Sequence, residues 1–132
     1  MKLSFNYKKY FEKNLDLKIE HINKPVLQNI KWVIGDLEVG KFDYMVQDDY
    51  VVIVGYNKYK DVPKGMGYKF IKICIDDLLK KYKGIFSPNK DRSLYSDMVW
   101  LKLEKEYDVF DFKLGYHNGN IIYSNSISDS LK

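Results

Sequence analysis

The chain has 132 residues and a formal net charge of +4, with 45% hydrophobic and 30% charged residues. These proportions are typical of one soluble globular domain and argue against a disordered or fibrous chain. A single cysteine excludes an intrachain disulfide. The sequence contains no run of eighteen apolar residues, so no membrane span is predicted. We therefore expect one cytoplasmic domain over residues 1–132, without a signal peptide.

The first third of the chain predicts a helix, a strand and one ambiguous segment. Helical spacing of aromatic residues favours a short amphipathic helix over residues 3–15, and strict alternation favours a strand over residues 15–22. Residues 25–40 repeat apolar side chains at helical intervals after Pro25, which favours a helix. The β-branched run before Gly35 supports the alternative, a strand that turns at Gly35-Asp36.

The middle of the chain predicts a hairpin, a loop, a strand and a helix. Phe42–Val46 and Tyr50–Tyr56 flank a short polar turn, and the second segment is apolar enough to be a strand buried on both faces. Residues 57–67 contain Pro63 and two glycines and predict a loop. Alternation over residues 68–75 then predicts a strand. Asp76 is a good N-cap for a helix that would end at Gly84.

The last third predicts a second hairpin. Residues 93–107 fit a helix or a strand equally well, whereas residues 109–116 alternate clearly. Asn118-Gly119 is the strongest turn signal in the chain and predicts a two-residue turn into a strand over residues 120–123. Residues 124–132 are serine-rich and predict a weakly ordered tail. Together these elements predict an α+β fold, with about five or six mostly antiparallel strands and two or three helices.

The sequence offers little that resembles a catalytic or metal site. The two histidines, His21 and His117, are far apart in the chain, and a metal site needs several convergent ligands. Cys74 lies in an apolar run and is expected to be buried. Acidic pairs such as Asp48 with Asp49 are more typical of solvated turns. We therefore expect no enzyme activity, no cofactor and no metal.

Glycines and lysines gather in the loop before residue 68. A glycine-rich loop can bind phosphate when it leads from a strand into the N-terminus of a helix. Here it is predicted to join two strands, which argues against a phosphate site. Lysines and tyrosines of this region could instead bind single-stranded nucleic acid, as an alternative function. The residues concerned are Lys58, Tyr59, Lys60, Lys64 and Lys69.

The favoured interpretation is a protein-binding module. Acidic residues can steer a basic partner, and tyrosines are frequent interface anchors. The candidate partner-binding residues are Asp48, Asp49, Tyr50, Tyr56, Glu104, Glu106 and Asp108. In overall character, as a single small domain without a catalytic signature, the chain resembles the immunity proteins of bacterial contact-dependent and polymorphic toxin systems. That resemblance implies a protein that binds and neutralises one cognate toxin domain.

Overall fold

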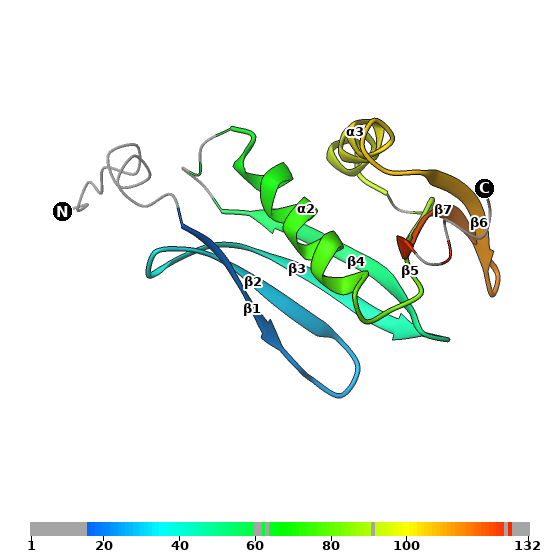
Figure 1. The fold of residues 1–132 in the computed structure, drawn as a ribbon, viewed down its shortest axis with the longest axis horizontal. Coiled ribbons are helices and arrows are strands. Elements are labelled where there is room, and N and C mark those ends of the chain that lie inside the picture. Colours follow the sequence, from blue (N-terminus) through cyan, green and yellow to red (C-terminus); the bar gives the residue numbers. More distant parts are fainter. Residues whose placement is uncertain (1–15, 60–61, 63, 91, 126, 128–132) are drawn as a thin grey trace. The chain divides into compact units, whose positions relative to one another are not determined.

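The computed structural model describes residues 16–59, 62, 64–90, 92–125 and 127 (Figure 1). The predicted helix over residues 3–15 and most of the predicted tail lie outside this range. The described elements comprise seven strands and two helices, whose bounds follow in chain order. They are β1 (Leu17–Ile22), β2 (Gln28–Ile34), β3 (Leu37–Gln47), β4 (Tyr50–Lys58), α2 (Met66–Leu78), β5 (Gly84–Pro88), α3 (Leu94–Leu103), β6 (Val109–Leu114) and β7 (His117–Tyr123).

The strands form one sheet in the order β1-β2-β3-β4-β5-β7-β6. Strand pairs β1/β2, β5/β7 and β6/β7 are antiparallel, and β4/β5 is parallel. The predicted α+β class with a mostly antiparallel sheet is therefore confirmed. The sheet has one strand more than the upper estimate from the sequence.

The chain divides into two compact units. The first contains residues 1–43 and 55–74, and the second contains residues 44–54 and 75–132. Strands β3 and β4 and helix α2 each contribute residues to both units. The expectation of a single domain stays a prediction.

The first unit contains the segment that fits a helix or a strand by its sequence. Residues 28–34 form strand β2 and not a helix, with Ile30, Trp32 and Ile34 almost fully buried on one face. Gly35 has a φ of 60°, in the left-handed region that glycine adopts without a Cβ penalty. The chain can therefore turn at Gly35 and Asp36, as the alternative predicted.

Helix α2 replaces the strand that was predicted over residues 68–75. Its fully buried residues follow helical spacing and are Phe70, Ile71, Cys74, Ile75 and Leu78. In the first unit the Trp32 ring stacks on Phe70 at 5.4 Å, and the Trp32 indole N–H donates to Cys74 Sγ at 3.3 Å. These contacts attach α2 to β2 and explain why the Cys74 side chain is buried.

The helix predicted to start at Asp76 does not form as a separate element. Asp76 lies in the last turn of α2, which ends at Leu78, and Gly84 begins strand β5. The segment between them is a turn, in which Lys81 and Tyr82 N–H groups donate to the Leu78 carbonyl. The capping signal was therefore wrong, because the apolar face of α2 already includes Ile75 and Leu78.

The buried residues of the second unit come from its strands and from α3. Val51, Ile85 and Ile122 come from three neighbouring strands and are buried, as are Trp100 and Leu103 of α3. The β3–β4 and β6–β7 connections are both tight turns. The second of these uses Gly115, with a φ of 62°, and not the predicted Asn118-Gly119, which lies inside β7.

Candidate functional site

The most distinctive connection in the chain is the β4–α2–β5 unit. It is the one place in the described sheet where a strand, a helix and a parallel strand follow one another. In open sheets, ligands bind beyond the carboxyl ends of parallel strands. The carboxyl end of β4 leads to α2, and that of β5 leads to α3 (Figure 1).

Strands β4 and β5 separate after a short ladder. Their register contains three pairs, Tyr50 with Gly84, Val51 with Ile85 and Val52 with Phe86. At the amino ends the two segments stay joined, because the Lys83 N–H donates to the Asp49 carbonyl at 2.9 Å. The divergence therefore lies toward the carboxyl ends.

Beyond Val52 and Phe86, β5 follows β7 instead of β4. Ser87 and Pro88 pair with Asn120 and Gly119 of β7. The next residue, Asn89, continues this pairing through its N–H to the Asn118 carbonyl at 2.9 Å. Within the described ladder, the edge of β4 at Ile53 and Val54 is consequently not paired with β5.

The side chains of β4 are also less covered than the sequence predicted. Val51 is fully buried and Ile53 is 8% exposed, but Val54 is 53% exposed. The strand is thus buried on one face and partly open on the other, so the prediction of burial on both faces was wrong. An exposed apolar side chain beside an unpaired strand edge suits contact with a ligand.

The N-terminus of α2 provides an anion-binding geometry. Gly65 has a φ of 89°, and α2 begins at the following residue, Met66. The first backbone N–H groups of a helix have no partner within the helix and favour an anion. The first turn of α2 contains no acidic residue, and Lys64 immediately precedes Gly65. The loop therefore runs from strand β4 into helix α2, so the prediction that it joins two strands, which argued against a phosphate site, was wrong.

The exit from β5 is fixed by Arg92, the only arginine in the chain. Its guanidinium donates to the Ser87 carbonyl at 2.6 Å and to Asn120 Oδ1 at 2.9 Å, and it lies over the Trp100 ring at 5.5 Å. The side chain is only 9% exposed, and Asp97 lies 3.8 Å away. A planar fork can make these contacts together and a lysine cannot. A lone arginine in a lysine-rich sequence was the signal that could have identified it.

A hollow of about 490 Å³ lies beside the carboxyl end of β5. It is lined by Asn89, Asp111, Phe112, Lys113, Asn118 and Gly119. Arg92 fixes the amide of Asn120, because Oδ1 accepts from the guanidinium and Nδ2 then faces Asp111 Oδ1 at 3.4 Å. Asp111 is thereby oriented at an exposed position of the hollow.

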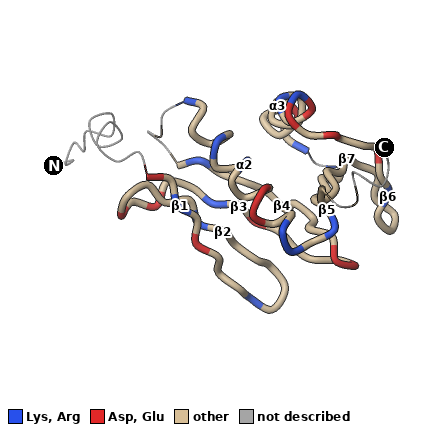
Figure 2. Tube along the Cα trace, viewed as in Figure 1, with Lys and Arg blue, Asp and Glu red and all other residues tan. Residues whose placement is uncertain are grey.

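Three of the predicted partner-binding residues lie at the β3–β4 turn. Asp48 and Asp49 have φ values of 54° and 66°, and the turn between β3 and β4 is the acidic tip at the lower right of Figure 2. Tyr50 follows them, with its ring 5.3 Å from that of Phe112. The turn gives both aspartates a structural role, because aspartate tolerates the left-handed region better than most residues.

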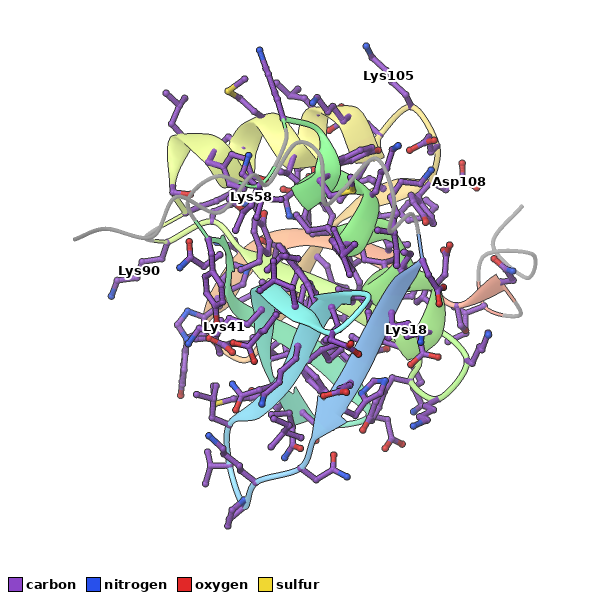
Figure 3. All side chains as sticks on the ribbon, turned by 90° about the vertical axis from the view of Figure 1, so that its left-hand side faces the viewer. Lys18, Lys41, Lys58, Lys90, Lys105 and Asp108 are labelled. Carbon is purple, nitrogen blue, oxygen red and sulfur yellow. The ribbon has the colours of Figure 1, made fainter. Side chains whose placement is uncertain are left out.

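The remaining predicted residues lie elsewhere. Tyr56, in the first unit, stacks on Phe42 at 6.0 Å. Glu104 ends α3, where its N–H donates to the Trp100 carbonyl, and Glu106 and Asp108 are exposed in the segment that follows. Asp108 points outward in Figure 3. The seven residues thus belong to three separate segments of the chain.

The lysine and tyrosine residues considered for nucleic acid are spread over the end of β4, the loop after it and the start of α2. The Tyr59 hydroxyl donates to Glu38 Oε2 at 2.7 Å, so this residue is engaged within the first unit. Lys60 lies outside the described residues. Lys64 and Lys69 lie before and within the first turns of α2.

In the described part of the chain, no group of three or more histidine, cysteine, aspartate or glutamate residues could hold a metal ion. Cys74 is buried, and His117 is exposed at the start of β7. The described ranges also contain no helix long and apolar enough to cross a membrane. The expectation of no metal stays a prediction.

Comparisons with known proteins identify the fold. No family model and no curated protein matches the chain. Among solved structures, an acetyltransferase from Bacillus subtilis in complex with CoA matches with a TM-score of 0.56 and 13% identity, over 83% of this chain and 99% of that one. The ribosomal-protein-S18-alanine N-acetyltransferase from Escherichia coli matches with a TM-score of 0.53 and 11% identity, over 76% and 68%.

A third match, a GNAT family acetyltransferase from Elizabethkingia anophelis with acetyl-CoA bound, has a TM-score of 0.51 and 10% identity, over 80% of this chain and 94% of that one. These matches contradict the resemblance to immunity proteins. The fold is that of acetyltransferases, so the expectations of a toxin-neutralising protein, of a toxin partner and of a non-enzymatic chain were wrong. The nucleic-acid alternative is overturned by the same matches.

Proposed function

We propose that this protein is an acetyltransferase that moves an acetyl group from acetyl-CoA to an amine. The observation that carries the proposal is the parallel ladder of β4 and β5 in the second unit, which ends after three pairs and leaves the edge of β4 at Ile53 and Val54 unpaired with β5. The acetyltransferase fold of the matching structures supports the same function.

The N-terminus of α2 fits the phosphates of CoA. Its first N–H groups and the helix dipole favour negative charge, and Lys64 adds a nearby cation. Gly65 adopts its positive φ without strain, and among the described residues a Cβ at this position would meet nothing within 4 Å. The described residues therefore leave the Gly65 backbone accessible to a bulky phosphate group.

The unpaired edge of β4 fits the arm that carries the thioester. This arm contains two amides, and an extended amide chain can add to an exposed strand edge through main-chain hydrogen bonds. Ile53 and Val54 offer such an edge in the second unit, and the half-exposed side chain of Val54 offers apolar contact. Backbone N–H groups of this edge could also stabilise the oxyanion that forms during acyl transfer.

The reaction itself needs little from the protein beyond positioning. The amine nitrogen forms a bond to the thioester carbonyl carbon, and the carbon–sulfur bond breaks. The amine loses a proton, and the departing thiolate gains one. In the second unit, Asp111 at the hollow beside β5 is placed to attract a cationic amine acceptor. A cytoplasmic location is part of this proposal, because acetyl-CoA is available there.

Calorimetric titration with CoA and acetyl-CoA tests the donor site. We expect both to bind, and Lys64→Glu to weaken binding by about tenfold through repulsion of the phosphates. The same substitution complements the helix dipole, so it should not destabilise the fold. Lys24→Glu makes the same charge change at an exposed site in the β1–β2 connection and should leave binding unchanged.

Turnover is tested by thiol release from acetyl-CoA in the presence of a panel of amines. Asp111→Asn should lower kcat/KM for cationic amines while the affinity for CoA stays unchanged. Absence of CoA binding at millimolar concentration would overturn the proposal. CoA binding without acetyl transfer to any amine, peptide or protein N-terminus would retain the ligand but contradict the reaction.

A further inference from the structure

Helix α3 is apolar on two opposite sides. Its buried side consists of Val99, Trp100 and Leu103, none more than 3% exposed. The opposite side carries an outer stripe, which we define as Leu94, Tyr95, Met98 and Leu101. Their exposed fractions are 77%, 46%, 54% and 61%. A helix that is covered on one side only has a polar outer face, so the outer stripe indicates a second contact.

The spacing of the outer stripe suits packing against another helix. Leu94, Met98 and Leu101 are separated by four and then three residues, which is the heptad interval of a helix–helix seam. Scattered single apolar residues on a surface need no explanation, but a continuous stripe marks an interaction site. We propose that the outer stripe binds the outer stripe of a second copy of this chain, with the two α3 helices parallel.

Charge complementarity supports a second copy in parallel orientation. Asp97 and Lys102 lie on opposite flanks of the outer stripe and are five residues apart. In a parallel pair of helices, a residue on one flank of the seam lies opposite the residue five positions later on the other flank of the partner helix. Asp97 of each copy would therefore face Lys102 of the other. The side chain of Asp97 is 53% exposed, and it also lies 3.8 Å from Arg92 of its own chain.

An antiparallel pair would bring like charges together. In that arrangement each flank meets the same flank of the partner, so Lys102 faces Lys102 and the acidic flank of Asp97 and Glu104 faces its own copy. A two-fold interface must be self-complementary, and here only the parallel arrangement is. Because the stripe is short, the contact is smaller than the standard interface of about 1,600 Å², and we expect a dissociation constant of about 10 µM or weaker.

Sedimentation velocity from about 1 to 200 µM tests the dimer, a range that spans the expected affinity. The full-length chain should shift from monomer to dimer across this range. Leu101→Glu should abolish the shift without unfolding the protein, because the side chain is already largely exposed. Tyr116→Glu, at a 97% exposed residue of the β6–β7 turn, is the matched control and should dimerise normally.

A charge swap tests the orientation. Lys102→Glu and Asp97→Lys should each weaken self-association at least tenfold. An equal mixture of the two variants should regain it, since both cross-pairs in the mixed dimer are then opposite in charge. Leu94→Cys should form a disulfide-linked dimer on mild oxidation, because Leu94 meets its own copy only in the parallel arrangement. Tyr116→Cys is the control.

A monomer at every concentration would overturn the proposal, as would a dimer that survives Leu101→Glu. A photoreactive benzoylphenylalanine at position 101 provides a separate measurement. Cross-linking to a second copy supports the proposal, whereas cross-linking to another segment of the same chain would assign the outer stripe to an intramolecular contact and refute it. The outcome does not depend on CoA binding.

Discussion

Gly119 predicts a hairpin turn by its sequence, but the structure needs glycine at this position for a different physical reason. Asn-Gly pairs favour tight hairpin turns, yet Gly119 lies in β7, opposite Pro88 of β5 and Phe112 of β6. A Cβ at this position would lie 2.1 Å from the Ser87 carbonyl oxygen and 2.8 Å from the Phe86 ring. Glycine is therefore needed for close approach of β5 and β7, and this requirement cannot be read from the dipeptide.

We expect Gly119→Ala to lower the free energy of unfolding by about 3 kcal/mol. The added Cβ would clash with the Ser87 carbonyl oxygen, which belongs to the backbone of β5 and cannot move away as a flexible side chain could. Urea unfolding measures the change. Gly55→Ala is the control, since a Cβ there would meet nothing within 4 Å. It should be neutral or stabilise by up to about 1 kcal/mol through the unfolded chain. Equal effects of the two substitutions would contradict the packing argument.

Tyr59 and Glu38 form the clearest polar pair of the first unit. The hydrogen bond to Glu38, together with burial, raises the pKa of Tyr59 to about 12. The same hydrogen bond lowers the pKa of Glu38, against the effect of burial and with help from Lys31 at 3.3 Å. Ionisation of Tyr59 is thus less favourable in the folded protein than in the unfolded chain, where its pKa is about 10.

This difference makes the stability depend on pH in a defined window. A group whose pKa is raised by folding contributes fully to the free energy of unfolding at pH values below its pKa in the unfolded chain. This contribution is lost as the pH rises toward the pKa of the group in the folded protein. We expect the wild-type protein to exceed Tyr59→Phe in stability at pH 8, with the difference shrinking between pH 10 and about 12. Urea midpoints of both variants across this range give the result. A constant difference would contradict it.

At the scale of elements, two-residue periodicity predicts the strands over residues 15–22 and 109–116 correctly, close to β1 and β6. The prediction fails where the apolar residues of one segment fit both the helical spacing and the alternation of a strand. Residues 25–40 repeat apolar side chains at helical spacing, yet burial of Ile30, Trp32 and Ile34 on one face of the sheet decides for β2. The α2 segment alternates like a strand, yet Phe70, Ile71 and Cys74 pack as a helix against Trp32. Long-range packing settled both cases, and it is not visible in a local window.

The β3–β4 turn gives a prediction at this scale. Asp48 and Asp49 both have positive φ, the geometry of a turn that prefers glycine at its second position. Asp49→Gly should therefore raise the free energy of unfolding by about 0.5–1 kcal/mol. Asp36→Gly is the control, because Asp36 does not have positive φ, so glycine there gains nothing from the turn geometry and adds unfolded-state entropy. Thermal unfolding should show opposite shifts for the two variants.

At the scale of the whole molecule, the sequence predicts the fold class but not the candidate site. The glycine loop is visible in the sequence, but the alternation after it predicts a strand and so argues against a phosphate site. The other candidate feature, the divergence of β4 from β5 in the second unit, depends on β5 pairing with β7 through Ser87 and Pro88. Such a pairing joins residues more than thirty positions apart, and no local pattern reports it.

The proposed contacts with CoA predict which backbone N–H groups the bound ligand protects. Saturating CoA should slow backbone hydrogen exchange over residues 53–58 and at the start of α2, because bound amides and phosphates protect these N–H groups. Strand β1, which pairs only with β2 within the described sheet, should be unaffected. Protection confined to β1 and β2 would contradict the site.

The two tryptophans of the chain lie in different units. Trp32 is within hydrogen-bonding distance of a thiol, a strong quencher of indole emission, whereas Trp100 lies beneath a guanidinium. Replacing either one with phenylalanine leaves a single fluorophore that reports on one half of the protein. The light emitted during denaturation can therefore reveal whether the halves melt together or one after the other.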